Sequence, residues 1–236
     1  MSLYPETEFG GFTRCNGTVA FYTRIDALLR PTDVVLDVGC GRGAHSEHPV
    51  DYIRRLRDFR GRCRAVWGCD VDAVGEQNPT IAQFFRINES GWDVPDAEID
   101  LAIADCVLEH VPDPDLFFRE AARVVRPGGY LCIRTPNALG YVSLAARVVP
   151  NRLHGRVVRL VAGRNEADTF PTLYRCNTAR RLHRALEQAG FKSAVYRHEP
   201  EPSYLGKGAA FRIGARLNAF IPAPLRNVLL AFGRRV

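Results

Sequence analysis

Short apolar runs alternate with stretches of helical periodicity along most of the chain. The runs are rich in Val, Ile and Leu and too short for typical helices, so each predicts a strand. The predicted strands cover residues 33–37, 64–69, 84–87, 100–104, 130–134, 191–196 and 228–232. Strands that alternate with helices indicate a mostly parallel sheet, so we expect an α/β fold with a doubly wound, seven-stranded sheet.

Three of the intervening segments carry a clear helical pattern. Residues 51–59 repeat apolar side chains at helical spacing, with arginines between them. Another helix can be capped by Asn177 or Thr178 and should end at Gly190. Residues 211–220 predict a further helix between the last two strands.

The connection after the fifth predicted strand is unusually long. About forty residues separate that strand from the helix capped at Asn177 or Thr178, whereas α/β connections usually need two to six. We therefore expect a helical cap insert at about 138–175, placed over the active site. With a helical lead at 1–30, the whole chain, 1–236, predicts a single domain.

The cysteine content and the hydropathy of the sequence indicate a cellular compartment. The seven cysteines form an odd set without a C-x-x-C pair, which favours a reducing cytoplasm over a disulfide framework. No apolar run approaches the roughly 20 residues of a membrane-spanning helix. We therefore predict a cytoplasmic protein, with peripheral contact at the inner face of the membrane as an additional hypothesis.

The net charge of +6 could indicate a polyanion partner. However, only Lys192 and Lys207 are lysines among the 32 basic residues, a bias that suggests a GC-rich coding sequence more than selection for phosphate contacts. We interpret the charge as a solvated basic surface and do not expect nucleic-acid binding.

The most informative stretch is Val34-Val-Leu-Asp-Val-Gly-Cys-Gly-Arg-Gly43, where a buried strand runs into three alternating glycines. Glycine permits positive φ and lets a ligand approach the backbone closely. A strand followed by a glycine turn predicts a cofactor pocket at the carboxyl edge of the sheet. The same residues also satisfy the dinucleotide pattern G-x-G-x-x-G/A, so NAD(P) remains an alternative ligand.

The next strand ends in Ala65-Val-Trp-Gly-Cys-Asp70, which places a carboxylate at the strand tip. Such a carboxylate can accept two hydrogen bonds from a ribose diol. Asp72 is a nearby rival, and either residue could instead cap a helix. We prefer Asp70 because it closes the apolar run.

Two further motifs carry a family resemblance. Residues 100–111, Asp-Leu-Ala-Ile-Ala-Asp-Cys-Val-Leu-Glu-His-Val, and Arg126-Pro-Gly-Gly129 resemble the class I S-adenosylmethionine (SAM)-dependent methyltransferases. The resemblance extends from residue 34 to about 137, and Thr135-Pro-Asn137 is similar to members that act on glycans, lipids and small metabolites. It implies a Rossmann-like sheet of order 3-2-1-4-5-7-6 with a helical insert after strand five.

The resemblance also implies a set of SAM-binding residues. The methionine end would lie on the glycine motif, the ribose at the end of the second strand, the adenine after the third, and the pocket floor after the fourth. The implied residues are Asp37, Gly39, Cys40, Gly41, Gly43, Asp70, Val71, Asn88, Glu89, Asp105 and Cys106.

His110 is the candidate catalytic base, because imidazole titrates near neutrality and follows the fourth strand. The alternative is that His110 only orders its loop. Glu109 and His110 also resemble the E-x-x-E-H metal motif of ubiquinone-pathway O-methyltransferases, but Cys106 stands at the first glutamate position. Since an oxygen ligand is lost, we expect no metal.

Substrate contacts are expected at the insert. The candidates are Tyr141, Tyr174 and Arg175, with Glu166 and Asp168 nearby. Residues 141–164 interleave apolar residues with arginines, which predicts one or two basic amphipathic helices broken near Pro150. They could lie on an anionic membrane or bind a phosphorylated or lipid-linked sugar. An ordinary lid with solvated arginines is the simpler interpretation.

The sequence thus predicts an enzyme that transfers a methyl group from SAM, leaving S-adenosylhomocysteine. The expected acceptor is a hydroxyl of a small metabolite, a sugar or glycan, or a lipid-linked intermediate. The alternatives are an NAD(P)-dependent oxidoreductase and a non-catalytic SAM-binding module. A nucleic-acid methyltransferase ranks lower, because the strand ending at Asp105 lacks the D/N-P-P-Y/F motif of amino-group methylases.

Overall fold

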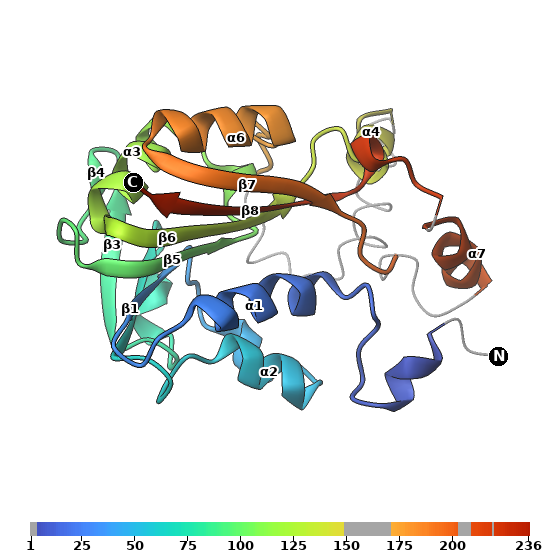
Figure 1. Ribbon diagram of the computed structural model, residues 1–236, viewed down its shortest axis with the longest axis horizontal. Coiled ribbons are helices and arrows are strands. Elements are labelled where there is room, and N and C mark those ends of the chain that lie inside the picture. Colours follow the sequence, from blue (N-terminus) through green and yellow to red (C-terminus); the bar gives the residue numbers. More distant parts are fainter. Residues whose placement is uncertain (1–3, 149–170, 203–208, 219) are drawn as a thin grey trace.

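The computed structural model describes residues 4–148, 171–202, 209–218 and 220–236 (Figure 1). In these ranges an eight-stranded sheet has the order β4-β3-β2-β1-β5-β6-β8-β7. Its strands are β1 (Val34–Val38), β2 (Ala65–Asp70), β3 (Gln83–Asn88), β4 (Gly91–Trp92), β5 (Ile99–Asp105), β6 (Val125–Pro136), β7 (Phe191–His198) and β8 (Val228–Arg235). The described α-helices are α1 (Gly17–Leu28), α2 (Asp51–Arg57), α3 (Pro114–Val124), α4 (Tyr141–Val148), α6 (Ala179–Gln188) and α7 (Ala209–Asn218).

The strand order confirms the expected topology with one correction. Without the short edge strand β4, the sheet reads 3-2-1-4-5-7-6, and β8 runs antiparallel between β6 and β7. The predicted count of seven strands was wrong because β4 has only two residues and therefore no periodicity. It forms because Trp92 N–H donates to the Glu120 carboxylate over 2.8 Å, and because Gly91 leaves room for that carboxylate.

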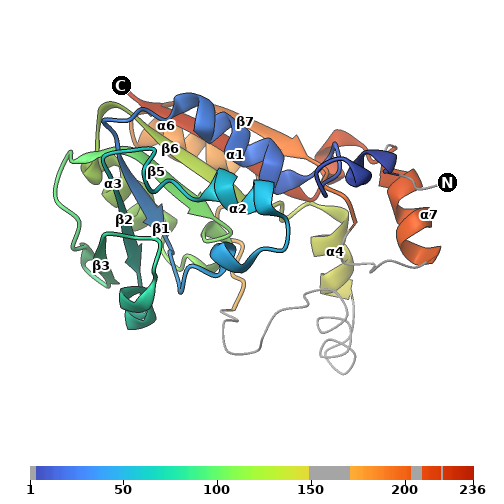
Figure 2. The same cartoon turned by 90° about the horizontal axis from the view of Figure 1, so that it is seen from below.

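Helices cover both faces of the sheet (Figures 1 and 2). On one face, Phe21 and Ile25 of α1 and Leu56 of α2 pack against the sheet. On the other, α3 and α6 supply apolar side chains that include Phe118 and Leu182. The interior of β1 and β5 is buried from both sides, which explains their continuous apolar runs.

Because β1, β2, β5 and β6 are parallel, their carboxyl ends meet at one edge of the sheet. The segments that follow these strands are the glycine turn, the turn before the 3-10 helix η3 (Ala73–Gln77), the 3-10 helix η4 (Leu108–His110), and the approach to α4. This edge is where open α/β sheets bind ligands.

The predicted helices are present with shifted ends. Thr178 is the N-cap of α6, since its hydroxyl accepts from Arg181 N–H, and Gly190 follows the helix at φ +82°. Asn177 therefore has another role, described below. The helix expected at 211–220 is α7, which begins two residues earlier. In the predicted insert the structure describes α4, whereas residues 149–170 lie outside the described residues.

Candidate functional site

The three motif glycines all adopt left-handed conformations, with φ of +71° at Gly39, +47° at Gly41 and +74° at Gly43. A Cβ on Gly39 would lie 2.5 Å from the Val107 side chain, and one on Gly43 would lie 2.3 Å from Asn78 Oδ1. A Cβ on Gly41 would meet no atom of the described part of the chain within 4 Å. The outer two glycines are thus required by packing, while the middle one keeps open space above the turn.

Asp70 faces this turn. Its Oδ2 accepts from Gly41 N–H over 2.9 Å, and its Oδ1 accepts from Asp72 N–H over 2.9 Å. Asp72 instead caps η3, with Oδ1 accepting from Val74 N–H, and Val71 between them is exposed. The geometry therefore brings Asp70 to the glycine turn and assigns Asp72 to capping.

Asn78 is a residue of this region that the sequence analysis missed. Its side-chain amide donates to the Cys40 carbonyl over 2.9 Å, while its Oδ1 accepts from the N–H and hydroxyl of Thr80. Asn78 is buried and thereby fixes the turn from below. The Asn78-Pro79 pair signalled only a turn.

Cys40 directs its thiol away from the open space of the turn. Its Sγ would lie 2.8 Å from a Cβ built on Gly68, within β2. Burial, followed by the nearby carboxylates of Asp37 and Asp70, raises the pKa of the Cys40 thiol to about 12. Any ligand contact by Cys40 is therefore a backbone contact.

A second cluster joins four elements around Asp105 at the end of β5. Arg134 of β6 binds both carboxylate oxygens, with Nε to Oδ1 at 2.6 Å and Nη2 to Oδ2 at 2.7 Å. Tyr22 of α1 donates to Oδ2 over 3.0 Å, and Arg57 of α2 approaches it at 3.4 Å. Burial alone would raise the pKa of Asp105, but the charge and hydrogen bonds of Arg134, with Arg57 and Tyr22, lower it to about 2. Asp105 therefore anchors the two arginines.

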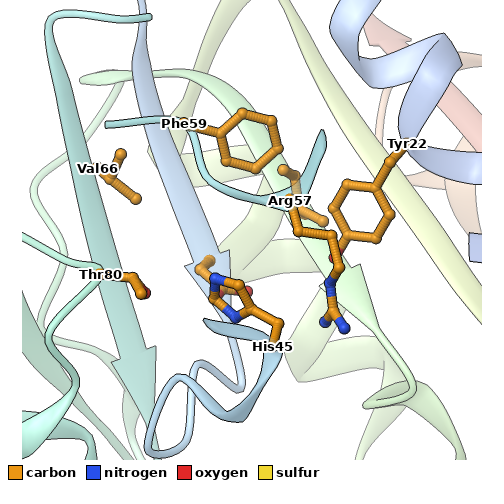
Figure 3. Close-up of a pocket in the computed structure, with 8 residues that line it drawn as sticks. Tyr22, His45, Arg57, Phe59, Val66 and Thr80 are labelled. Atoms are coloured by element: carbon orange, nitrogen blue, oxygen red, sulfur yellow. The ribbon is translucent and has the colours of Figure 1, made fainter. Parts of the chain in front are cut away.

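Between this cluster and the glycine turn lies a small cavity at the end of β1, lined by Tyr22, Asp37, His45, Arg57, Phe59, Val66, Thr80 and Ile103 (Figure 3). The Arg57 guanidinium lies 5.1 Å from the centre of the Tyr22 ring. Within the described residues, neither Arg57 Nε nor His45 Nε2 has a hydrogen-bond partner, although both atoms are buried. Such unsatisfied buried polar atoms are costly, so the cavity is suited to a polar or anionic ligand.

Burial at the cavity also changes the protonation of Asp37 and His45. Burial, the principal cause, and the nearby Asp105 and Asp70 raise the pKa of Asp37 to about 7, although Arg57 opposes them. Burial and the charge of Arg57 lower the pKa of His45 to about 4. Near neutral pH, His45 is therefore uncharged, and Asp37 is poised to gain or lose its proton.

The positions implied for the adenine are at the turn between β3 and β4. Asn88 Oδ1 accepts from the N–H groups of Ser90 and Gly91, so its side chain shapes the turn. Asn88 and Glu89 are both exposed. Their contact with a cofactor stays a prediction.

A series of hydrogen-bonded, buried polar side chains leads from Asn177 to Glu109, next to His110. Asn177 Nδ2 donates to Thr135 Oγ1 over 2.6 Å, and that hydroxyl donates to Glu109 Oε2 over 2.9 Å. Glu109 Oε1 is 3.9 Å from His110 Nε2. Burial is the main cause of the raised pKa of Glu109. The sequence indicated Asn177 only as a possible helix cap and did not indicate Thr135 as part of the site, because contacts between distant loops leave no periodic pattern.

His110 is held by the segment that ends the predicted insert. The ring Nδ1 lies 3.1 Å from the Pro171 carbonyl, and the Glu109 carbonyl accepts from the N–H groups of Leu173 and Tyr174. Tyr174 has φ +52°, an uncommon value for a non-glycine residue. The structure thus brings Tyr174 next to the η4 turn, and its contact with a substrate stays a prediction.

The other substrate candidates in the described residues, Arg175 and Tyr141, make contacts with elements other than η4. Arg175 is exposed, and its carbonyl accepts from Arg181 of α6. The Tyr141 hydroxyl lies 3.3 Å from Asn218 Oδ1, at the junction of α4 and α7. Glu166 and Asp168 lie outside the described residues.

Metal-binding clusters and membrane-spanning helices are both absent from the described ranges. No three His, Cys, Asp or Glu side chains there gather as ligands for a metal ion. In those same ranges, no helix combines the length and apolar character needed to cross a bilayer.

Comparison with known proteins identifies a family. A family model described as a methyltransferase domain matches residues 16–194. A Mycolicibacterium smegmatis protein named "Probable S-adenosylmethionine-dependent methyltransferase" is 31% identical over 112 residues, covering 45% of this chain and 39% of the relative. The ubiquinone biosynthesis O-methyltransferase of Pseudomonas syringae pv. tomato is 35% identical over 136 residues, covering 50% and 53%. The chain thus spans about half or less of these relatives.

Solved structures support the fold. The geranyl diphosphate C-methyltransferase of Streptomyces coelicolor superposes with a TM-score of 0.54 at 15% identity, covering 92% of this chain and 78% of that one. A Thermotoga maritima protein described as a SAM-dependent methyltransferase gives a TM-score of 0.56 at 14% identity, covering 93% and 89%. At such low identities these likenesses establish the Rossmann-like fold alone.

Proposed function

The chain belongs to this methyltransferase-domain family, and from that premise we propose that it binds SAM at the glycine turn and transfers the methyl group to an acceptor. The observation that carries the proposal is the open space above Gly41, beside the buried Asp70 carboxylate. Family membership favours SAM over NAD(P) as the ligand of this turn. The direct test is calorimetric titration with SAM and NADH, described at the end of the Discussion.

The donors and acceptors around the turn fit the polar groups of SAM. Arg57 Nε and His45 Nε2, buried and without partners among the described residues, would suit the carboxylate of the methionine end when His45 carries its proton on Nε2. Asp37 would balance the ammonium group, because a nearby cation favours its ionised form. Asp70 retains acceptor capacity for a ribose hydroxyl, since each carboxylate oxygen has two lone pairs. In this proposal Asp105 positions Arg57 and Arg134 beneath the ligand.

Bound SAM would supply an already activated methyl group on a sulfonium. The main tasks of the chain are then to orient the acceptor for in-line attack and to exclude water. The segment around Tyr174, held by the Glu109 carbonyl, is the described part of the chain best placed for the second task.

We propose His110 as the base for a hydroxyl acceptor. Because a carbonyl oxygen only accepts, the 3.1 Å contact with Pro171 requires the proton on Nδ1. The neutral ring then carries a lone pair on Nε2, the atom that would take the acceptor proton. Glu109, 3.9 Å from Nε2, would stabilise the imidazolium that forms.

The acceptor class follows from the relatives and remains a proposal. Several relatives are named ubiquinone biosynthesis O-methyltransferases, which favours a hydroxyl on a small molecule. Release of S-adenosylhomocysteine can be compared for three hydroxyl probes, 3,4-dihydroxybenzoate, L-rhamnose and a short-chain polyprenyl phosphate sugar, and for one thiol and one amine probe. Turnover with a hydroxyl-bearing probe, reduced in His110→Gln, supports the proposal. Turnover confined to a thiol or amine probe contradicts it.

A further inference from the structure

Large apolar side chains are exposed together on α7 and the turn that follows it. Phe220 is 81% exposed, Ile213 59% and Leu217 57%. These residues repeat at intervals of four and three, so they share one helical face, and Phe220 N–H still bonds to the Leu217 carbonyl. Leu225, in the 3-10 helix η7 (Ala223–Leu225), is a fourth exposed apolar residue. We call Ile213, Leu217, Phe220 and Leu225 the α7 apolar surface.

The opposite face of α7 is tied to the rest of the protein. Phe211 packs edge-on against Tyr4, with ring centres 6.1 Å apart. Asn218 Nδ2 donates to the Pro200 carbonyl over 2.7 Å. These contacts fix the rotation of the helix, so the exposure of Ile213, Leu217 and Phe220 is set by packing on the far side.

The chain segment that carries the α7 apolar surface is basic. Arg216 is exposed on the same helical face. From residue 202 to 236 the sequence contains no aspartate or glutamate but six basic residues. Residues 121–165, which include α4, also lack acidic residues. The two segments meet where the Tyr141 hydroxyl of α4 lies 3.3 Å from Asn218 Oδ1 of α7. Glu199 Oε1 lies 3.4 Å from the same hydroxyl and accepts from Asn227, so the carboxylate at this junction is already hydrogen-bonded.

The position of this surface in the fold is also informative. Figures 1 and 2 show α4 and α7 at the same end of the molecule, beyond the carboxyl end of β6 and away from the C-terminus. The α7 apolar surface therefore lies beyond the sheet edge that carries the candidate site.

We propose that the α7 apolar surface and Arg216 dock the protein onto an anionic lipid leaflet. An apolar helical face flanked by arginine suits the bilayer interface, where apolar side chains enter the acyl boundary and guanidinium groups pair with lipid phosphates. A second copy of the chain fits less well, because a symmetric contact through α7 would bring the Arg216 side chains of two basic segments together. The proposal extends beyond methyl transfer and does not depend on it.

Co-sedimentation of the full chain with vesicles tests this proposal. We expect binding to vesicles containing phosphatidylglycerol, weakened by salt, and little binding to pure phosphatidylcholine vesicles. The triple variant Ile213→Asn, Leu217→Gln, Phe220→Ser should bind at least about tenfold more weakly. Arg216→Glu should bind about fivefold more weakly and lose part of the salt dependence.

Two matched control variants distinguish the role of this surface from the general effect of losing an exposed apolar side chain or a positive charge. Val236→Ser removes an apolar side chain of similar exposure at the C-terminus, and Arg184→Glu reverses an exposed charge on α6. Both should bind vesicles like the unaltered protein. Far-UV circular dichroism and the unfolding midpoint should be unchanged in every variant, because all altered side chains are exposed.

Three results would overturn the proposal. The first is no binding of the unaltered chain to anionic vesicles, and the second is equal binding by the triple variant. The third is a concentration-dependent dimer without lipid that the triple variant abolishes, which would assign the surface to a second copy. Vesicle binding without SAM binding would leave this proposal standing and contradict only the proposed function.

Discussion

Gly41 and Asp70 are joined by a 2.9 Å hydrogen bond from the glycine N–H to the aspartate Oδ2. This contact links the turn after β1 to the tip of β2, the two strands whose ends form the candidate pocket. Because Asp72 N–H occupies the other carboxylate oxygen, Asp70 is oriented before any ligand arrives. Preorganisation of this kind lowers the cost of ordering the site when a ligand binds.

The variant Gly41→Ala should distinguish the effect of backbone strain on stability from the effect of the glycine on ligand binding. The variant should lose about 1 kcal/mol of stability from strain at positive φ, and SAM affinity should fall at least about tenfold because the new methyl group enters the ligand space. Gly190→Ala is the matched control, since Gly190 has φ +82°, equally open surroundings among the described residues, and a position after α6 where its carbonyl accepts from Val236 N–H. It should lose similar stability in urea unfolding and keep its SAM affinity. Equal SAM affinity in both variants would contradict this role for Gly41.

Arg134→Met should be strongly destabilising, by about 3–5 kcal/mol, because it leaves the buried Asp105 carboxylate without its two strongest hydrogen bonds. The matched control is Arg60→Met, which breaks the largely exposed pair with Asp58 and should cost less than about 1 kcal/mol. Urea unfolding at pH 7 measures both. Similar losses in the two variants would show that the buried cluster does not stabilise the fold.

The pH dependence of the free energy of unfolding should reveal the raised pKa of Asp37. Its pKa is raised to about 7 in the folded protein, so its contribution is fully present below the unfolded pKa and is lost as pH rises through 7. The shift corresponds to about 4 kcal/mol. Asp37→Asn should therefore gain stability relative to the unaltered chain between pH 4 and 8, as measured by urea unfolding. A constant difference across this range would contradict the raised pKa.

The contribution of Asp105 to stability should change with pH in the opposite direction to that of Asp37. Its folded pKa is lowered to about 2, so its contribution is present above the unfolded pKa and is lost as pH falls from about 4 to 2. Asp105→Asn should lack this acid-induced loss of about 2 kcal/mol. Unfolding midpoints recorded at steps between pH 5 and 2 provide the measurement. An unchanged acid limb in the variant would contradict the assignment.

His110→Gln should lower kcat by about 10²-fold or more with a hydroxyl acceptor, while SAM affinity stays unchanged. His183→Gln on α6 is the control, since His183 is exposed and remote from η4. Both variants are compared through the rate of S-adenosylhomocysteine release. A loss below threefold would indicate that His110 only orders its loop.

The sequence was sufficient for the fold because parallel strands carry continuous apolar runs, and the family motifs implied their order. It also located the glycine turn and Asp70, which are local to strand ends. It could not reveal β4, which depends on the approach of Glu120 to Gly91, or the orientation of the Cys40 thiol. The chain from Asn177 through Thr135 to Glu109 joins three distant segments, and such contacts leave no periodic signal.

The central claim is tested most directly by calorimetric titration of the purified chain with SAM, with NADH as the competing ligand. We predict micromolar binding of SAM, no binding of NADH, and at least about tenfold weaker SAM binding in Asp70→Asn. Asp72→Asn, the neighbouring carboxylate that only caps η3, should bind SAM normally. Absence of SAM binding, preference for NADH, or equal effects of the two substitutions would contradict the account.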